Sequence, residues 1–361
     1  MSEKEIKEFV ANLSEDNKQK LSVTVDTLME LIEKKRLRIS IGGEDGQEII
    51  EKINDLLNVH TKKTEVVEYP VDKINRLVWD IDSSIDAEVN VSHTKDKEIN
   101  IGCTINFAGL EQAGLKLGRN LTAYDKRVYY AVSALYNAGN ETFSIPMIWR
   151  TMGMSGSNPK ADESKKIYDS IVKMRFTALT INNTEEVKNY KYPLVTDTIY
   201  NSTLLSSEDA QCKINGNWTD KVIRITRKPI LLDFAEGRKQ LTTFPLEVWK
   251  TPLKKTDTNL KLEDYLLERI AGARPRTQAT AKTTKKKQST LSNVILYETI
   301  LEEIAPKDTT TRDARNSLKR RLPKTVGTLL SYYVSCGHIA NYKADKDSVT
   351  VCFNVGNGKQ C

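Results

Sequence analysis

The chain has 361 residues, of which 39% are hydrophobic and 29% charged, and its mean hydropathy is -0.48. At about 150 residues per domain, this length predicts two or three domains, and the composition is that of a globular protein. No run approaches the roughly 18 consecutive apolar residues of a membrane span, and the start MSEKEIKEFV lacks the apolar core of a secretory signal. We therefore expect a cytoplasmic protein without a membrane partner.

Cysteine and histidine spacing gives no sign of a metal site or a catalytic centre. The five cysteines form no CxxC pair, and the three histidines have no histidine or cysteine partner at helical ligand spacing. The glycines near position 43 lack a following GKS or GKT, and His338 does not begin the HxxR box of a tyrosine recombinase. The sequence thus predicts no cofactor, no metal and no catalytic residue, and we expect a protein that is not an enzyme.

Charge is distributed unevenly along the chain. Residues 1–120 hold 17 basic and 23 acidic groups, a balance of -6, and the rest hold 55 - 17 = 38 basic and 48 - 23 = 25 acidic groups, a balance of +13. Residues 269–297 contain seven Lys and Arg and no acid, and a second basic cluster spans 307–324. Such clusters favour a polyanion, because neutralised phosphates release condensed counterions.

The first 118 residues predict an acidic α/β region. Apolar residues at helical spacing indicate helices over 1–38 and 47–57. Short strands are indicated over 38–41, 66–69, 89–91 and 98–107. We expect this region to serve interaction with protein or dimerisation rather than DNA binding.

Residues 119–272 predict a first winged-helix domain with an extension. Thr122 and Asp125 suit the start of a helix over 122–139, which an extended piece over 141–143, a short helix to 152 and a third helix over 160–176 follow. We expect a β-hairpin that pairs 177–181 with 190–194. This order is typical of a winged helix, whose third helix presents its N-terminal side to the major groove. Lys160, Ser164, Lys165 and Lys166 would face DNA there.

The extension comprises strand-like segments over 221–226 and 228–234 and helices over 244–250 and 260–270. Residues 273–290 then form a lysine-rich stretch with many threonines, which predicts a flexible basic linker. Its three consecutive cations, Lys285, Lys286 and Lys287, are expected to contact phosphates.

Residues 291–355 predict a second winged-helix domain of the same architecture. We expect helices over 291–304, 311–321 and 324–335, with Pro306 and Pro323 ending the first two. A hairpin is expected to pair 338–343 with 348–353. The fold class predicted for the whole chain is α+β, with tandem winged-helix domains after the acidic α/β region.

Three segments carry a family resemblance. The runs LTAYDKRVYYAVSALYNAGNETFSIPMIWRTM, IRITRKPILLDFAEGRKQLTTFPLEVW and KTDTNLKLEDYLLERI resemble plasmid-type replication initiators with two winged-helix domains, including relatives on mobile elements of Gram-positive bacteria. The resemblance covers about 120–355. It implies binding to direct repeats (iterons) of double-stranded DNA at an origin, local duplex opening, association with nucleoid or plasmid, host replication partners such as a helicase, and a homodimer. The long acidic N-terminal region and the long basic linker depart from the family.

The resemblance also implies positions that contact DNA. It assigns base reading to the third helix of each domain and phosphate contacts to the second helix of the second domain. The residues so implied, beyond those already named, are Lys173, Arg312, Arg315, Lys319, Arg320, Arg321, Lys324, Thr325, Thr328 and, on the hairpin, Lys343.

Two other classes compete with a replication initiator. One is a transcriptional regulator or partition protein of a phage or integrative element, which more often uses one reading helix per subunit and a dimer axis. The other is a scaffold protein that acts through its N-terminal region. The number of protomers bound per DNA site distinguishes a regulator from an initiator. A DNA affinity that does not depend on salt would favour the scaffold protein.

Overall fold

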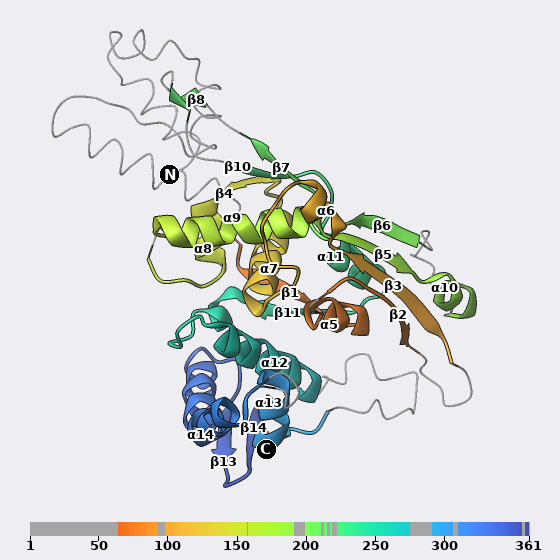
Figure 1. Cartoon of the computed structure of the whole chain (residues 1–361). Helices are drawn as coiled ribbons and strands as arrows, with labels where there is room; N and C mark the ends of the chain where they lie inside the picture. Colours follow the sequence, from red (N-terminus) through yellow and green to blue (C-terminus); the bar gives the residue numbers. More distant parts are fainter. Residues whose placement is uncertain are drawn as a thin grey trace, which may run out of the picture.

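The computed structural model describes residues 64–81, 83–91, 98–156, 158–190, 199–210, 213–214, 217–218, 222–274, 291–305, 310–355 and 358–360. Within these ranges the fold mixes helices with antiparallel strands (Figure 1). The helices expected over 1–38 and 47–57 and the strand expected over 38–41 lie outside the described residues. No helix in these ranges is long and apolar enough to cross a membrane.

We define unit one as a helix, a strand, two helices and two further strands whose three strands share a sheet in the order β4-β10-β7. A capping box starts its first helix, because Thr122 Oγ1 accepts from the Asp125 amide at 3.2 Å and Asp125 Oδ2 accepts from the Thr122 amide at 2.9 Å. The expected helix start is thus confirmed. The elements are α7 (Ala123–Asn137), β4 (Thr142–Ser144), α8 (Ile145–Thr151), α9 (Ala161–Phe176), β7 (Ser207–Ala210) and β10 (Val222–Ile225).

The hairpin expected directly after the third helix is wrong. Strand β5 (Ala178–Asn182) pairs instead with β3 (Asn100–Asn106) and with β6 (Ile199–Thr203), and residues 184–190 form a helix, α10 (Thr184–Tyr190). The expected partner 190–194 lies mostly outside the described residues. The non-local pairing prevails because Ile105 and Cys103 of β3 stand opposite Leu179 and Ile181 of β5 in register, and all four side chains are buried.

Strands from the N-terminal third pair with strands that follow α7 in the chain. Strand β2 (Ile85–Asn90) completes a four-stranded sheet of order β2-β3-β5-β6, and β1 (Val66–Pro70) pairs with β11 (Leu241–Pro245). The strands expected over 66–69 and 98–107 are thus confirmed. Around them lie α5 (Lys73–Trp79), α6 (Ala108–Gln112), α11 (Ile230–Gly237), the 3-10 helix η1 (Leu246–Trp249) and the short pair β8 (Lys213–Ile214) and β9 (Asn217–Trp218).

The strand expected over 228–234 is wrong, because residues 230–237 form α11. A continuous apolar run such as Ile230–Leu232 fits a buried helix and a buried strand equally well, so its periodicity cannot decide between them. The strand expected over 221–226 and the helix expected over 260–270 are confirmed as β10 and as part of α12.

We define unit two as a second set with the element order and sheet order of unit one, except that β5, α10, β6, β8 and β9 interrupt unit one between α9 and β10. Its strands follow the order β12-β14-β13, with the first strand and the last strand paired in both units. Its elements are α12 (Asp257–Ala273), β12 (Val294–Leu296), α13 (Tyr297–Ile304), α14 (Arg312–Ser335), β13 (Asn341–Ala344) and β14 (Ser348–Val355), and β15 (Gly358–Gln360) adds to β14. The hairpin expected over 338–353 is confirmed as β13 and β14.

The three helices expected over 291–335 are wrong in two respects. Residues 294–296 form strand β12, where Val294 and Leu296 are exposed and Ile295 is buried against β14. Helix α12 therefore takes the place of the first helix. In addition, α14 continues through Pro323, although proline removes an amide donor. Leu322, Val326 and Leu329 are buried on the same side of the helix before and after the proline, so both halves pack against one core.

The residues on either side of the expected linker over 273–290 are hydrogen-bonded to each other. The Leu291 amide donates to the Gly272 carbonyl at 3.0 Å, and Arg269 Nη2 donates to the Ser292 carbonyl at 3.2 Å. Strand β12 thus begins beside the end of α12. Residues 275–290, with Lys285, Lys286 and Lys287, lie outside the described residues.

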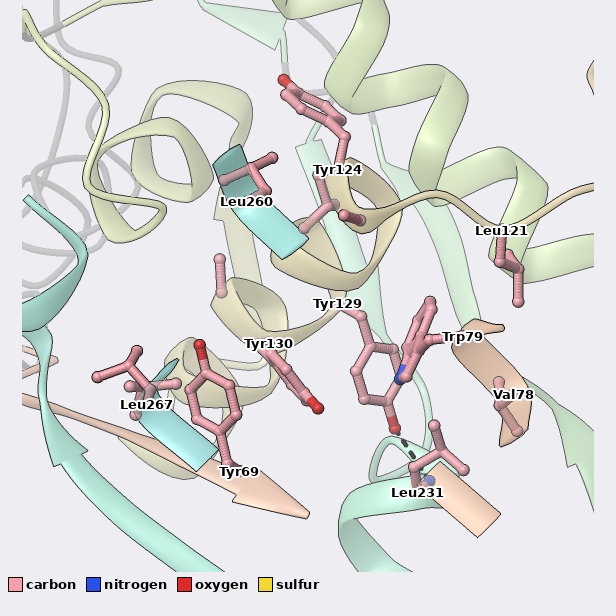
Figure 2. Close-up of a cluster of buried hydrophobic side chains, with 14 of the residues drawn as sticks. Tyr69, Val78, Trp79, Leu121, Tyr124, Tyr129, Tyr130, Leu231, Leu260 and Leu267 are labelled. Atoms are coloured by element: carbon pink, nitrogen blue, oxygen red, sulfur yellow. Dashed lines mark hydrogen bonds between the residues drawn. The ribbon is translucent and has the colours of Figure 1, made fainter. Parts of the chain in front are cut away.

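Helix α7 lies at the centre of the buried core. Figure 2 shows its Tyr129 and Tyr130 between Tyr69 of β1 and Trp79 of α5. The Tyr129 hydroxyl accepts from the Leu231 amide at 2.9 Å, so this buried oxygen keeps a partner. The core therefore joins segments 50 to 100 residues apart in the sequence, and it includes the strand that precedes unit one.

Candidate nucleic-acid interface

Helix α14 has one buried side and one exposed side along its whole length. Leu322, Val326, Leu329 and Tyr333 recur at spacings of three and four and are buried. On the opposite side the same spacing brings together five residues that are all exposed: Ser317, Arg320, Lys324, Thr328 and Ser331. We call these five residues the outer face of α14. Arginine, lysine and hydroxyl side chains are the types that bind base edges and phosphates.

No acidic side chain among the described residues neutralises the cations of the outer face. Arg320 and Lys324 form no ion pair with another described residue, and the same holds for the exposed Arg312 and Arg321 beside them. Lys319 differs, because its Nζ lies 3.2 Å from Glu298 Oε2 on α13. The positive field of α14 is therefore directed to solvent, where phosphates can approach.

Arg315 was expected to contact DNA, and the structure gives it another role. Its side chain is buried, its Nη2 lies 2.9 Å from Glu298 Oε1 and 2.7 Å from Glu302 Oε2, and its Nη1 donates to the Ala305 carbonyl. These contacts join α14 to α13. Because only 10% of the side chain is exposed and its guanidinium is bonded within the unit, we assign Arg315 to the core of unit two.

Two threonines of α14 bond back to the helix. Thr325 Oγ1 donates to the Arg321 carbonyl at 3.1 Å, and Thr328 Oγ1 donates to the Lys324 carbonyl at 3.0 Å. Each hydroxyl keeps its acceptor capacity. Thr328 lies on the outer face, whereas Thr325 lies at its side and is half-buried.

The β13–β14 hairpin is tied to α14. Tyr342 of β13 places its hydroxyl 3.2 Å from the Gly327 carbonyl and 2.9 Å from Ser331 Oγ. The next residue, Lys343, is exposed, and so is Lys346 in the turn that follows. Because the exposed Asp345 and Asp347 flank Lys346, the hairpin brings two cations beside α14 without a net positive charge.

In unit one, α9 presents a less basic surface. Lys165 Nζ lies 2.7 Å from Asp169 Oδ2, and the Lys166 ammonium lies 3.9 Å from the centre of the Tyr124 ring. Lys160 precedes the first turn and is exposed, and Ser164 is half-buried. Of these expected DNA contacts, Lys160 is thus free of ion pairs with described residues, while Lys165 already has an acidic partner.

Lys173 was also expected to contact DNA, and it is instead held inside unit one. Its Nζ lies 2.8 Å from Asp125 Oδ2 and donates to the Asn120 carbonyl at 3.1 Å, with 12% of the side chain exposed. Because Asp125 is the capping carboxylate of α7, Lys173 joins the start of that helix to α9. We assign it a structural role.

The two third helices therefore differ in charge. The sequence of α9 holds four basic residues and three acidic ones, a balance of 4 - 3 = +1. The sequence of α14 holds six basic residues and one acidic one, a balance of 6 - 1 = +5. In the strands of unit one, Glu208 and Asp209 further pair with Arg224 and Arg175. Helix α14 thus has a stronger attraction for a polyanion than α9.

Ser317, Ser331 and Lys346 were not among the residues predicted to contact DNA. A helix that ends at Pro323 has no face that crosses the proline, and Ser317, Arg320, Lys324 and Thr328 come together only when the helix is continuous. The buried positions 315, 322, 326, 329 and 333 carry the necessary signal, since their spacing is helical throughout when the proline is ignored.

The titratable groups of the described part show no metal centre. No group of three or more His, Cys, Asp and Glu among the described residues could hold a metal ion.

His338 is buried next to Arg274, and burial together with that charge lowers the pKa of its imidazole to about 4. This histidine is thus neutral at physiological pH and belongs to the packing of unit two against β11, where it contacts the ring of Phe244.

Comparisons with known proteins give a limited result. No family model matches the chain, and no curated protein matches it. A crystal structure of RctB domains 2-3 is similar with 12% identity and a TM-score of 0.38, over 77% of this chain and 88% of that one. A selenomethionine structure of domains 2 and 3 of RctB gives the same identity and TM-score over 77% and 92%. At these values the likeness supports no argument about function.

Proposed function

We propose that the chain is a sequence-specific double-stranded DNA-binding protein and that units one and two are winged helices. In each unit the third helix, α9 or α14, would lie in a major groove and the following strands would reach the flanking backbone. The repeated element order and the matching sheet orders β4-β10-β7 and β12-β14-β13 support this assignment. We further propose that the protein acts without catalysis.

The outer face of α14 is the observation that carries the proposal. It brings Arg320 and Lys324 together with Ser317, Thr328 and Ser331 on a helix side that no described residue covers. The exposed cations attract phosphates, and the hydroxyls and the arginine suit the hydrogen-bonding edges of bases. In this proposal unit two provides most of the affinity, and α9 adds contacts through Lys160, Lys165 and Lys166.

We propose replication initiation of a plasmid or mobile element as the biological role, through binding of direct repeats at an origin. The resemblance of residues 121–152 and of the later segments to plasmid-type initiators supports this role, as do two reading helices in one chain. Such an arrangement lets a single protomer contact two successive major-groove segments about 10 base pairs apart. A host helicase, a second protomer and a cytoplasmic location on the nucleoid or plasmid belong to the same proposal.

A transcriptional regulator or partition protein is the second candidate. The weaker positive charge of α9 favours it, because one effective reading helix per subunit suits a symmetric dimer.

One experiment distinguishes the two candidates. Purified protein is mixed with genomic and plasmid fragments at two salt concentrations, and the bound fragments are sequenced. Enrichment of tandem direct repeats supports the initiator, and a single inverted repeat over a promoter supports the regulator. An absence of enrichment at both salt concentrations would contradict sequence-specific DNA binding altogether.

A further inference from the structure

Helix α12 belongs to both halves of the structure. By element order it is the first helix of unit two, yet it contacts α7 of unit one as well as α13 (Figure 1). The two units therefore meet along one helix that both cores share. Their relative orientation depends on how firmly α12 is held against α7.

The contact between α7 and α12 is centred on a buried ion pair. Arg127 of α7 has no exposed surface, and its Nη2 lies 2.9 Å from Glu263 Oε2 and 3.1 Å from Asp264 Oδ1 of α12. Its guanidinium carbon lies 4.5 Å from the centre of the Trp249 ring. Buried charges are tolerated only when their partners are correctly placed, so this group strongly favours one position of α12.

Neighbouring side chains contact the same two carboxylates. The Tyr69 hydroxyl donates to Asp264 Oδ1 at 3.1 Å and accepts from Trp249 Nε1 at 2.5 Å. Lys255 Nζ lies 2.9 Å from Glu263 Oε1. A shift of α12 along α7 would separate several of these partners at once, which adds to the penalty for any other arrangement.

Other hydrogen bonds hold unit two against the rest of the structure at a distance from this centre. The Ala123 amide, at the start of α7, donates to Asp257 Oδ1 at the start of α12 at 2.8 Å. The Tyr332 hydroxyl of α14 donates to the Glu247 carbonyl of η1 at 2.7 Å. Contacts at the start of α12 and on α14 itself oppose rotation of unit two about the Arg127 centre.

We propose that Arg127 is a positioning residue for DNA recognition, which sets the spacing between the DNA segments that α9 and α14 contact. This inference rests on the proposed function, because it requires both helices to bind one duplex. DNA turns once in about 10 to 10.5 base pairs, so two rigidly held helices fit only sites of one spacing and one helical phase. Two units on a flexible linker would instead accept several spacings.

The first test uses the protein without DNA. Nitroxide-bearing amino acids at the exposed positions Ala161 of α9 and Ser317 of α14 report the distance between the two helices by pulsed electron resonance. The wild type should give one narrow distance distribution, and Arg127→Met should broaden it. Arg127→Lys should restore part of the narrowness, because a single nitrogen of Arg127 contacts both acids.

The matched control breaks another buried ion pair that does not cross the junction. Arg238 Nη2 lies 2.7 Å from Glu186 Oε1, with both side chains buried. Arg238→Met should lower stability and leave the label distance unchanged. A distribution that stays narrow in Arg127→Met would overturn the proposal. If that variant does not fold, Lys126→Met replaces it, because Lys126 also joins α7 to α12 through Glu268 at 3.4 Å.

The second test measures affinity on a selected duplex with five base pairs inserted between its two protected segments. The insertion turns the second segment by about half a helical turn, so the wild type should lose about 100-fold in affinity and Arg127→Met less than about 10-fold. Equal losses in both proteins would overturn the positioning role. A wild type that binds no duplex contradicts the proposed function instead, and the label distances still decide whether Arg127 fixes the units.

Discussion

The Tyr342 hydroxyl of β13 lies 2.9 Å from Ser331 Oγ on the outer face of α14. The same hydroxyl donates to the Gly327 carbonyl at 3.2 Å. The hairpin that carries Lys343 is thereby held at a fixed distance from the face that we propose to read DNA. A ligand that contacts both surfaces meets them already in place, which lowers the entropic cost of binding.

Tyr342→Phe removes these two hydrogen bonds and keeps the aromatic ring. We expect a loss of about 0.5–1.5 kcal/mol in stability and a roughly three- to tenfold lower affinity for the selected duplex, because the hairpin is no longer tied to α14. Thermal unfolding and fluorescence anisotropy measure the two effects. A variant that binds DNA as tightly as the wild type would show that the hairpin takes no part in binding.

The hairpin cations Lys343 and Lys346 are expected to contact phosphates rather than bases. Replacing both with Ala should weaken binding to cognate and unrelated duplexes by a similar factor. It should also reduce the slope of log affinity against log salt by about one to two. Titrations at four salt concentrations test this, and a loss confined to the cognate duplex would assign the two lysines to base reading.

Arg315 is expected to contribute to stability. Arg315→Met removes its ion pairs with Glu298 and Glu302 and its hydrogen bonds to α13 carbonyls. We expect the free energy of unfolding to fall by about 1–3 kcal/mol. The loss stays in this range because both glutamates are about half-exposed and are hydrated again in the variant. Denaturant unfolding measures this loss. Arg312→Met, on the exposed side of the same turn, is the control and should unfold like the wild type. If Arg312→Met were less stable than Arg315→Met, Arg315 would not belong to the core of unit two.

His338 makes stability depend on pH in an acidic window. Its pKa is lowered to about 4 in the folded chain by burial and by Arg274, whereas an unfolded histidine has a pKa of about 6.5. Between these values the unfolded chain binds the extra proton, so this contribution is complete above pH 6.5 and is lost as the pH falls toward 4. We expect His338→Phe to flatten the pH dependence of the free energy of unfolding between pH 4 and 6.5. An unchanged slope would mean that other groups cause it.

Gly153 should resist substitution for two independent reasons. Its φ angle is +74°, and a Cβ at this position would lie 2.5 Å from the Trp249 carbonyl oxygen. Gly153→Ala therefore combines a left-handed backbone with a clash against backbone atoms, and we expect a loss of about 1–3 kcal/mol. Gly156→Ala is the control. The φ of Gly156 is also positive, at +82°, but no atom lies within 4 Å of a Cβ added there. A similar loss in both variants would show that the close approach to Trp249 does not matter.

Local sequence signals predicted the helices of unit one and the last hairpin. The capping box at Thr122 and Asp125 and the alternation of Val349, Val351 and Phe353 are complete within a few residues. Long-range pairing was not predictable in this way. Strand β5 prefers β3, which lies about 75 residues earlier, because the register of Leu179 and Ile181 suits that strand. The return of the chain from Leu291 to Gly272 likewise has no local signal.

The candidate site was predicted in part. Basic residues of α14 stand out by composition, but composition does not separate the buried Arg315 from the exposed Arg320. Their roles differ because the helix turns about 100° per residue, so that residues five apart lie on different sides. Whether an acid neutralises a lysine, as Asp125 does for Lys173, depends on tertiary contacts that spacing alone does not give.

The outer face of α14 as the main DNA-binding surface is the central claim, and one comparison of affinities tests it directly. The double variant Arg320→Ala/Lys324→Ala is compared with Lys165→Ala/Lys166→Ala of α9 on the selected duplex at fixed salt. We predict that the α14 variant loses about 100-fold or more and the α9 variant about tenfold or less. Equal affinity of the α14 variant and the wild type would contradict the account.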